Sequence, residues 1–242
     1  MPETENFVNT LAEGTILCFD KPLGWTSFDV VNKFRVLARQ ILGLQKLKAG
    51  HAGTLDPLAT GLLIICTGKQ TKNIESFQEM EKEYTGIFTL GQTTPSFDLE
   101  TKPDATFATD HIATTDILLA MQNLSGIQDQ LPPLFSAKMV DGKRAYKIAR
   151  QGGHAELKTK SITISTFELT HFNIPDVGFR VVCSKGTYIR SLARDLGTTL
   201  SSGAYLKELR RTRIGQYEAS HAWSLESFEK ELRSLSHLKD LG

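Results

Sequence analysis

Short runs of residues rich in β-branched and aromatic side chains recur along the chain and predict strands. Residues 15–19, 84–90 and 161–169 are such runs. At residues 179–184, the apolar residues Phe179, Val181 and Cys183 alternate with a second set that includes Arg180 and Ser184. This alternation favours a half-buried strand. Residues 50–67 begin with a loop punctuated by glycines and end in an apolar run that fits either a strand or a helix.

A three- to four-residue spacing of apolar positions predicts helices elsewhere. One helix follows Thr26, and Asp29 stands three residues later, as in a capping box. Others are expected at residues 112–124, 145–150 and 189–196, whereas residues 1–13 are polar and expected to be frayed. Because strands and helices do not alternate regularly, the fold class predicted is α+β, with a mixed, mostly antiparallel sheet flanked by helices. No repeat and no composition shift divides the chain, so we expect one domain over residues 1–242.

Composition narrows the class of protein. The chain has 242 residues, of which 40% are hydrophobic and 23% charged, as in folded globular proteins. Its longest apolar run, at residues 62–66, is too short to cross a bilayer, and no secretory signal is visible. Three distant cysteines without a C-x-x-C pair argue against a disulfide framework or a zinc site. We therefore expect a reducing compartment, the cytoplasm.

Charge is distributed unevenly although the net charge is only +1. Seven Lys or Arg stand against two acidic residues at 138–160, and the same counts recur at 185–213. At residues 75–110, eight acidic residues stand against two basic ones. These stretches are either solvated faces that cancel or one side of the protein that binds a polyanion.

Residues 50–61 form the most unusual segment. Its glycines permit tight turns and the close approach of a ligand. Pro57 pushes Asp56 into an extended conformation between the apolar residues Leu55 and Leu58. A carboxylate held in such a place needs a partner, or it takes up a proton. Asp56 is therefore either an ordinary turn residue before a proline or a chemically active carboxylate.

This segment resembles the catalytic motif of the TruB family of tRNA pseudouridine synthases. Four further blocks resemble the family's motifs in the same order, at residues 21–27, 82–84, 130–146 and 183–192. The resemblance runs from about residue 14 to 216. It implies a pseudouridine-synthase catalytic domain and an isomerase that converts uridine 55, in the T loop of tRNA, to pseudouridine. It also implies that no cofactor is required, and the sequence offers no phosphate-binding glycine loop or metal cluster.

The resemblance also implies roles for individual residues. Asp56 would be the nucleophile, attacking either the ribose C1′ or the base C6. Arg190 would pair with Asp56 and keep it ionised. Tyr84 would stack on the flipped base, with its phenol near the proton that moves. His51 would wedge into the loop where the extruded uridine had stacked.

Further residues are implied as substrate contacts. Tyr188 would line the uracil pocket, and Leu209 would contact the uracil. Basic residues would bind phosphates of the T arm. The substrate-binding set comprises His51, Tyr188, Leu209, Lys21, Lys138, Lys143 and Arg144, with Lys147, Arg210, Arg211 and Arg213 as further phosphate contacts.

The chain departs from the family pattern in two places. It ends about 25 residues after Tyr217, so we expect no C-terminal RNA-binding domain of the PUA type. A glycine usual in the family is missing near Asp98, so the loop there is expected to differ. Two other functions remain open: a guide-RNA-dependent pseudouridine synthase, and an RNA-folding factor that acts without turnover. No membrane and no obligate protein partner are predicted.

Overall fold

The computed structural model describes residues 2–136, 138–140, 142–153 and 155–240. Backbone contacts divide the chain into two compact units: unit 1, Met1–Lys82 with Arg210–Gly242, and unit 2, Glu83–Leu209. The chain enters unit 2 along strand β4 (Lys82–Leu90) and leaves it along β12 (Ala204–Ile214). No composition shift marks either crossing, and the single catalytic domain stays a prediction.

Unit 1 contains a small sheet centred on strand β3. Strand β1 pairs with β3 in antiparallel register, from Ile16↔Cys66 to Lys21↔Gly61, and β2 pairs with β3 from Ala49↔Thr67 to His51↔Ile65. β12 is the next neighbour of β3, and β13 extends the edge. The apolar run at residues 62–66 is thus a strand that is buried throughout. The bounds are β1 (Ile16–Lys21), β2 (Ala49–His51), β3 (Ala59–Thr67) and β13 (Tyr217–Glu218).

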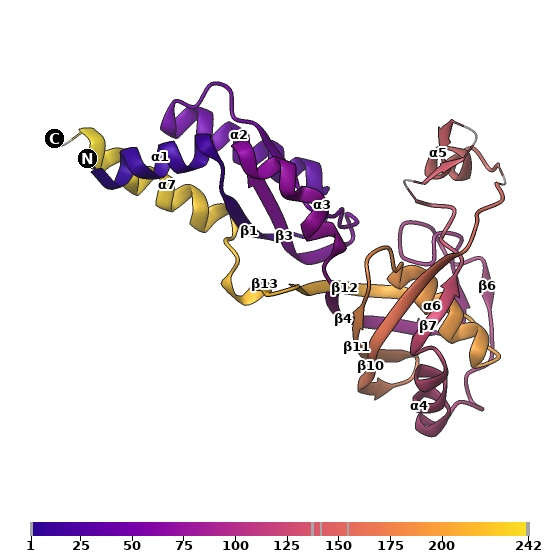
Figure 1. The fold of residues 1–242 in the computed structure, drawn as a ribbon. Coiled ribbons are helices and arrows are strands. Elements are labelled where there is room, and N and C mark those ends of the chain that lie inside the picture. Colours follow the sequence, from indigo (N-terminus) through magenta and orange to yellow (C-terminus); the bar gives the residue numbers. More distant parts are fainter. Residues whose placement is uncertain (1, 137, 141, 154, 241–242) are drawn as a thin grey trace. The chain divides into compact units, whose positions relative to one another are not determined.

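Helices pack on this sheet through one core cluster that includes Phe19, Phe34 and Phe228. Figure 1 shows α7 running beside α1, and α2 also contacts α7. The predicted capping box is confirmed, because Thr26 and Asp29 exchange hydrogen bonds in both directions. The helices are α1 (Pro2–Glu13), α2 (Ser27–Leu42), η1 (Gly68–Asn73), α3 (Ile74–Glu79), η2 (Ala219–His221) and α7 (Leu225–Asp240).

The N-terminal segment corrects the expectation of a frayed end. Residues Pro2–Glu13 form helix α1, and Leu11 is fully buried. Phe7 packs against the same cluster one helical turn earlier. The polar composition hid this short apolar stripe, which is stabilised by packing on α7.

Unit 2 holds a larger sheet with the order β12–β4–β11–β10–β7. The pairs β10–β11 and β10–β7 are antiparallel, as predicted. Apart from this sheet, β5 pairs with β6 and β8 pairs with β9, both antiparallel. The bounds are β5 (Gln92–Thr93), β6 (Ala105–Thr106), β7 (Gly126–Gln130), β8 (Met139–Val140), β9 (Lys143–Arg144), β10 (Lys160–Asn173) and β11 (Asp176–Cys183).

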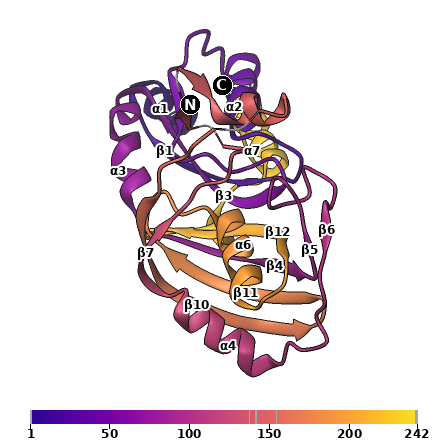
Figure 2. The same ribbon diagram turned by 90° about the vertical axis from the view of Figure 1, so that its right-hand side faces the viewer.

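Three helices complete unit 2: α4 (Thr114–Asn123), α5 (Ala145–Arg150) and α6 (Ile189–Thr199). Figure 2 shows α6 lying across the strands and α4 beside β10, and both contribute to one core with β4, β10 and β11. Both faces of β11 are largely buried, so the half-buried strand predicted around Val181 is corrected. Among the described residues no helix is long and apolar enough to cross a membrane.

Gly61 is required where β3 passes β12. Its φ is 105°, and an added Cβ would lie 2.2 Å from the carbonyl oxygen of Arg211. Gly24 has a similar φ of 82° with nothing within 4 Å of such a Cβ. We expect Gly24→Ala to lower the free energy of unfolding by about 1–2 kcal/mol, the cost of the left-handed backbone. Gly61→Ala should cost clearly more in urea unfolding, and equal losses would contradict this role for the close approach.

Candidate active site

The loop that carries Asp56 connects β2 to β3 in unit 1. Leu55 is buried and Asp56 half-buried, while Pro57 and Leu58 face solvent. The N–H of Ala59 donates to the carbonyl of Asp56 at 3.0 Å, which closes a turn. The Ser27 hydroxyl accepts from the N–H of Leu55 at 2.8 Å and donates to its carbonyl at 3.2 Å. The start of α2 thus fixes the residue that precedes Asp56.

Lys21, the last residue of β1, is hydrogen-bonded to the loop. Its side chain has no exposed surface, and Nζ donates to the carbonyls of Trp25 at 2.6 Å, Pro22 at 3.0 Å and Pro57 at 3.4 Å. Burial lowers the pKa of Lys21 to about 8, and Asp56 partly opposes this by attraction. A protonated Lys21 therefore places a positive charge close enough to Asp56 to interact with it.

Arg211, on β12, is the second buried cation of this loop. Only 1% of its surface is exposed. Nε donates to the carbonyl of Leu62 at 2.8 Å, Nη2 to Gly53 at 3.2 Å and Nη1 to Thr54 at 3.5 Å. Arg211 therefore holds the first half of the loop while Lys21 holds the second. Both cations donate to backbone carbonyls of the loop and of the segments beside it.

His51 ends β2 and is half-buried. Burial, followed by the nearby charge of Arg211, lowers the pKa of His51, which favours the neutral ring. Its Nδ1 is buried and has no hydrogen-bond partner among the described residues. A neutral ring is a poor ligand for a phosphate, and the wedging role of His51 stays a prediction.

Lys21 gives a prediction on pH. Its pKa falls from about 10.5 in the unfolded chain to about 8 in the folded one, so between these values the unfolded chain binds more protons. Its contribution to stability therefore rises with pH over that window. We therefore expect wild type to gain stability relative to Lys21→Met between pH 8 and pH 10. A constant difference in urea titrations would contradict this.

In unit 2, Tyr84 and Leu209 lie on the neighbouring strands β4 and β12. Both are partly buried against the same core cluster. The strands approach closely here, because a Cβ on Gly86 would lie 2.1 Å from the carbonyl oxygen of Glu208. The structure thus brings an aromatic and an aliphatic side chain to one region of the sheet, and their contact with uracil stays a prediction.

Tyr188 directly precedes α6 and is fixed by the end of β7. The side chain of Gln130 accepts from the N–H of Tyr188 at 2.8 Å and donates to its carbonyl at 3.2 Å. This two-point contact sets the backbone from which the half-buried Tyr188 ring projects. It also explains why Gln130, a polar residue, is buried.

Arg190, in the first turn of α6, has a buried partner in unit 2. Its Nε lies 3.6 Å from Oδ2 of Asp98, and both side chains are less than 10% exposed. Its Nη1 donates to the carbonyl of Phe135 at 2.8 Å and to that of Ser96 at 3.4 Å. Asp56 belongs to unit 1, so its pairing with Arg190 stays a prediction. Asp98 is the residue that the sequence analysis missed, noting it only for a glycine absent nearby.

The predicted phosphate contacts differ in availability. Lys138 is half-buried, and burial followed by Lys160 lowers its pKa. The side chains of Lys143 and Arg144 lie outside the described residues. Arg210 makes a two-point ion pair with Asp20, at 2.7 and 2.9 Å.

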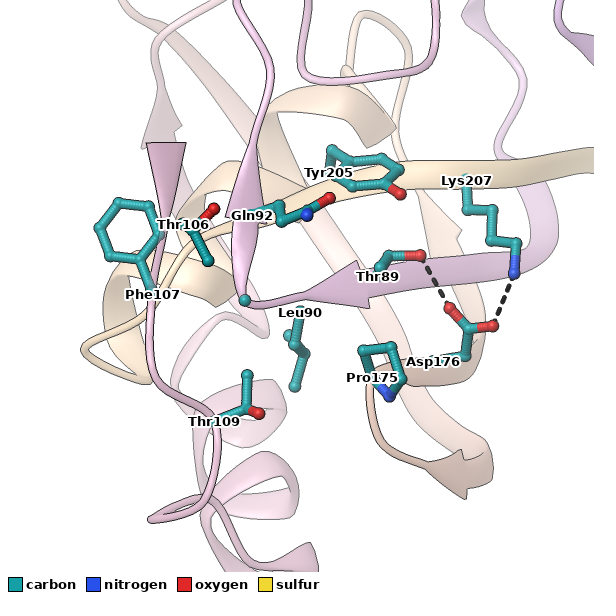
Figure 3. Close-up of a pocket in the computed structure, with 11 residues that line it drawn as sticks. Thr89, Leu90, Gln92, Thr106, Phe107, Thr109, Pro175, Asp176, Tyr205 and Lys207 are labelled. Atoms are coloured by element: carbon teal, nitrogen blue, oxygen red, sulfur yellow. Dashed lines mark hydrogen bonds and ion pairs between the residues drawn. The ribbon is translucent and has the colours of Figure 1, made fainter. Parts of the chain in front are cut away.

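A hollow of about 470 Å³ lies elsewhere in unit 2 (Figure 3). Phe107 borders one end, and at the other Asp176 accepts from Thr89 at 2.8 Å and from Lys207 at 2.6 Å. None of the predicted site residues lines it. Because the ion pair is satisfied internally, we assign it to holding β4, β11 and β12 together. Within the described residues, no cluster of three or more His, Cys, Asp or Glu is placed to hold a metal ion.

The sequence matches the models of two known protein-family domains. Residues 39–189 match the model of the TruB family pseudouridylate synthase N-terminal domain, which is more than half of the chain. Residues 190–240 match the tRNA pseudouridylate synthase B C-terminal domain. The chain belongs to the TruB family of pseudouridylate synthases.

Individual members of the TruB family are similar over nearly their whole length. tRNA pseudouridine synthase B of Phocaeicola vulgatus is 56% identical over 220 residues, 91% of this chain and 94% of the relative. That of Flavobacterium johnsoniae is 52% identical over 222 residues, 91% and 97% of the two chains. One chain of a solved Cbf5–Nop10–Gar1 complex is structurally similar, with a TM-score of 0.70 and 27% sequence identity. The match covers 96% of this protein but only 61% of that chain. The predicted family, α+β fold and enzyme class are confirmed.

Two predicted contacts are corrected within this TruB framework. Lys21 was placed among the substrate-binding residues, yet its buried ammonium is bonded to three carbonyls of its own unit. Arg211 was placed among the phosphate contacts, yet it is buried on the carbonyls of residues 53, 54 and 62. Both act by positioning the Asp56 loop. Lys21 was predicted from its place in the block at residues 21–27, and Arg211 from the basic stretch at 185–213. Neither signal distinguishes direct contact from support.

Proposed function

We propose that this protein converts uridine 55 in the T loop of tRNA to pseudouridine, with Asp56 as the nucleophile. The observation that carries the proposal is the Asp56 loop itself. Two buried cations, Lys21 and Arg211, hold its carbonyls in a chain of the TruB family. Such a loop presents a carboxylate on a fixed backbone, which is what nucleophilic catalysis requires.

The reaction is an isomerisation within one nucleotide. Asp56 attacks either the ribose C1′ or the uracil C6, and the bond between N1 and C1′ breaks. The uracil turns and a bond forms between C5 and C1′. The bond to Asp56 breaks, which restores its carboxylate, the proton on C5 leaves and N1 gains a proton. Atoms and electrons balance without a cofactor. Tyr84 is proposed to stack on the uracil near the proton that moves.

The uridine has to leave the loop stack before Asp56 can reach it, which costs a few kcal/mol. His51 is proposed to fill the vacated position, and Tyr188 and Leu209 to contact the extruded uracil. Arg190 is proposed to face Asp56 as well as its observed partner Asp98. One guanidinium has enough donors for two carboxylates.

The T arm is the proposed recognition element, and Lys138, Lys143 and Arg144 are the proposed phosphate contacts. Units 1 and 2 are proposed to act as one catalytic domain, without an obligate protein partner, in the cytoplasm. The proposal of tRNA as the substrate is supported by relatives above 50% identity that are named tRNA pseudouridine synthase B.

The test is a turnover assay with unmodified tRNA transcript carrying tritium on C5 of uridine. Formation of pseudouridine releases the label, and mapping of the product locates the modified position. A transcript with cytidine at position 55 is the control and should release no label. Binding without release would favour an RNA-folding factor, and release that requires a guide RNA would favour the guide-dependent alternative.

A further inference from the structure

The large exposed apolar side chains of unit 1 belong to segments that are bonded to the Asp56 loop or to the end of β1 that holds it. Among its described residues, four large hydrophobic side chains are markedly exposed: Leu23 at 63%, Phe28 at 59%, Leu58 at 38% and Trp223 at 38%. Exposed apolar residues are ordinary when scattered, whereas a cluster marks an interaction surface. Hydrogen bonds connect the segments that carry all four to the Asp56 loop or to β1.

Three of the four residues lie next in sequence to residues that form the Asp56 loop or are hydrogen-bonded to it. Leu23 precedes Gly24, whose N–H donates to the carbonyl of Pro57 at 2.8 Å. Phe28 follows Ser27, whose hydroxyl is bonded to Leu55. Leu58 follows Pro57 directly. Leu55 and Pro57 are the immediate neighbours of Asp56. Each of the three exposed residues is therefore adjacent either to one of these neighbours or to a residue hydrogen-bonded to one of them.

Trp223 belongs to the same end of β1. Its N–H donates to the carbonyl of Cys18 at 2.9 Å, and its carbonyl accepts from the N–H of Asp20 at 2.8 Å. Asp20 directly precedes Lys21, which holds the Asp56 loop. We call Leu23, Phe28, Leu58 and Trp223 the apolar rim.

Charges beside the apolar rim are neutralised within the protein. Asp20 is paired with Arg210, Lys33 with Glu229, and Asp29 caps α2 through Thr26. A surface of this kind offers little to a phosphate group. It offers flat apolar contact, which a nucleobase face can use.

Beside the rim is a hollow of about 400 Å³ lined by Gly24, Trp25, Asp29, Asn32 and Lys33. Trp25 packs on the core of unit 1 and contributes an aromatic wall to this hollow. Asn32 adds an amide, which can both donate to and accept from a base edge. The hollow thus combines an aromatic wall with hydrogen-bonding capacity, next to the exposed Phe28.

We propose that the apolar rim binds unstacked nucleobases of the substrate loop that flank the reacting uridine, with Phe28 as the stacking residue. The proposal rests on the proposed function, because a uridine that reaches Asp56 brings its neighbouring nucleotides to the surface around that residue. Loop bases removed from their own stack need a flat partner, and aromatic side chains provide it. The rim therefore offsets part of the cost of opening the loop.

The experiment measures affinity for unmodified tRNA in the Asp56→Asn background, so that the RNA stays unmodified. Phe28→Ala should weaken binding about 5- to 150-fold, the range for loss of one aromatic–base stack. Phe28→Tyr keeps the ring and should bind within about twofold of the parent, whereas Phe28→Leu keeps only apolar bulk and should resemble Phe28→Ala. Leu118→Ala, which alters a 50%-exposed side chain of α4 in unit 2, is the matched control and should change nothing.

The dependence of affinity on salt concentration is a second measurement, and it distinguishes a loss of stacking from a loss of electrostatic binding. Because stacking releases no counterions, the loss caused by Phe28→Ala should be the same factor at low and at high salt.

Three outcomes would overturn the proposal. They are unchanged affinity of Phe28→Ala, equal losses for Phe28→Tyr and Phe28→Ala, and a protein dimer that Phe28→Ala dissociates without any effect on RNA affinity. A wild-type protein that binds tRNA but never forms pseudouridine would instead contradict the proposed function, so the two failures are distinguishable.

Discussion

Asp56→Asn should abolish pseudouridine formation, with a loss of several orders of magnitude in the single-turnover rate. The amide keeps the shape of the carboxylate but cannot form and release the covalent bond that nucleophilic catalysis needs. The loop should keep its conformation, because Lys21 and Arg211 hold it through backbone carbonyls, which the substitution leaves in place. Affinity for unmodified tRNA should therefore change little.

The control is Asp110→Asn, the same chemical change at an exposed residue of unit 2. It should leave turnover and binding unchanged. Turnover by Asp56→Asn near that of wild type would remove Asp56 from the role of nucleophile. A large loss of tRNA binding would show that the charge serves recognition instead.

Arg190→Met should lower the free energy of unfolding by about 3–5 kcal/mol, because it leaves the Asp98 carboxylate buried without its cation. At about 2–4 °C per kcal/mol for a chain of this size, the melting temperature should fall by about 6–20 °C. The matched control is Arg150→Met, which breaks the exposed ion pair with Glu100 and should cost at most about 1 kcal/mol. Equal losses would contradict a buried pair.

A double variant separates the charge pair from the loss of packing. Arg190→Met with Asp98→Asn removes both charges, so it should be more stable than the sum of the two single changes predicts. Strict additivity in urea unfolding would show that the two residues do not interact. Arg190→Lys, which keeps the charge but loses the planar fork, should still cost substantial activity.

Local signals predicted the elements of the fold well. The helix after Thr26 was predicted from a capping box that the structure contains, and the strand ending at Leu90 from its β-rich composition. Helix α1 was missed because its stripe of apolar residues is short, and its burial depends on α7, which lies more than 200 residues away in sequence. Tertiary packing of that kind leaves little trace in local periodicity.

The site was predicted through motifs, and motifs do not say which atoms a side chain contacts. Asp56, Tyr84 and Arg190 were identified from their sequence blocks, but Lys21 was assigned to the substrate instead of to the carbonyl of Pro57. Asp98 was passed over because a carboxylate in a polar loop is usually solvated. Only the fold shows that this loop is buried against the start of α6.

The two cations on the Asp56 loop also constrain how this chain can vary over evolutionary time. Surface loops ordinarily accept insertions and deletions. Here Arg211 reaches the carbonyls of residues 53 and 54, and Lys21 that of residue 57, so both ends are bound to separate strands. One added residue between them would pull a carbonyl away from its buried donor. The spacing between Gly53 and Pro57 should therefore be invariant in length even where the side chains between them change.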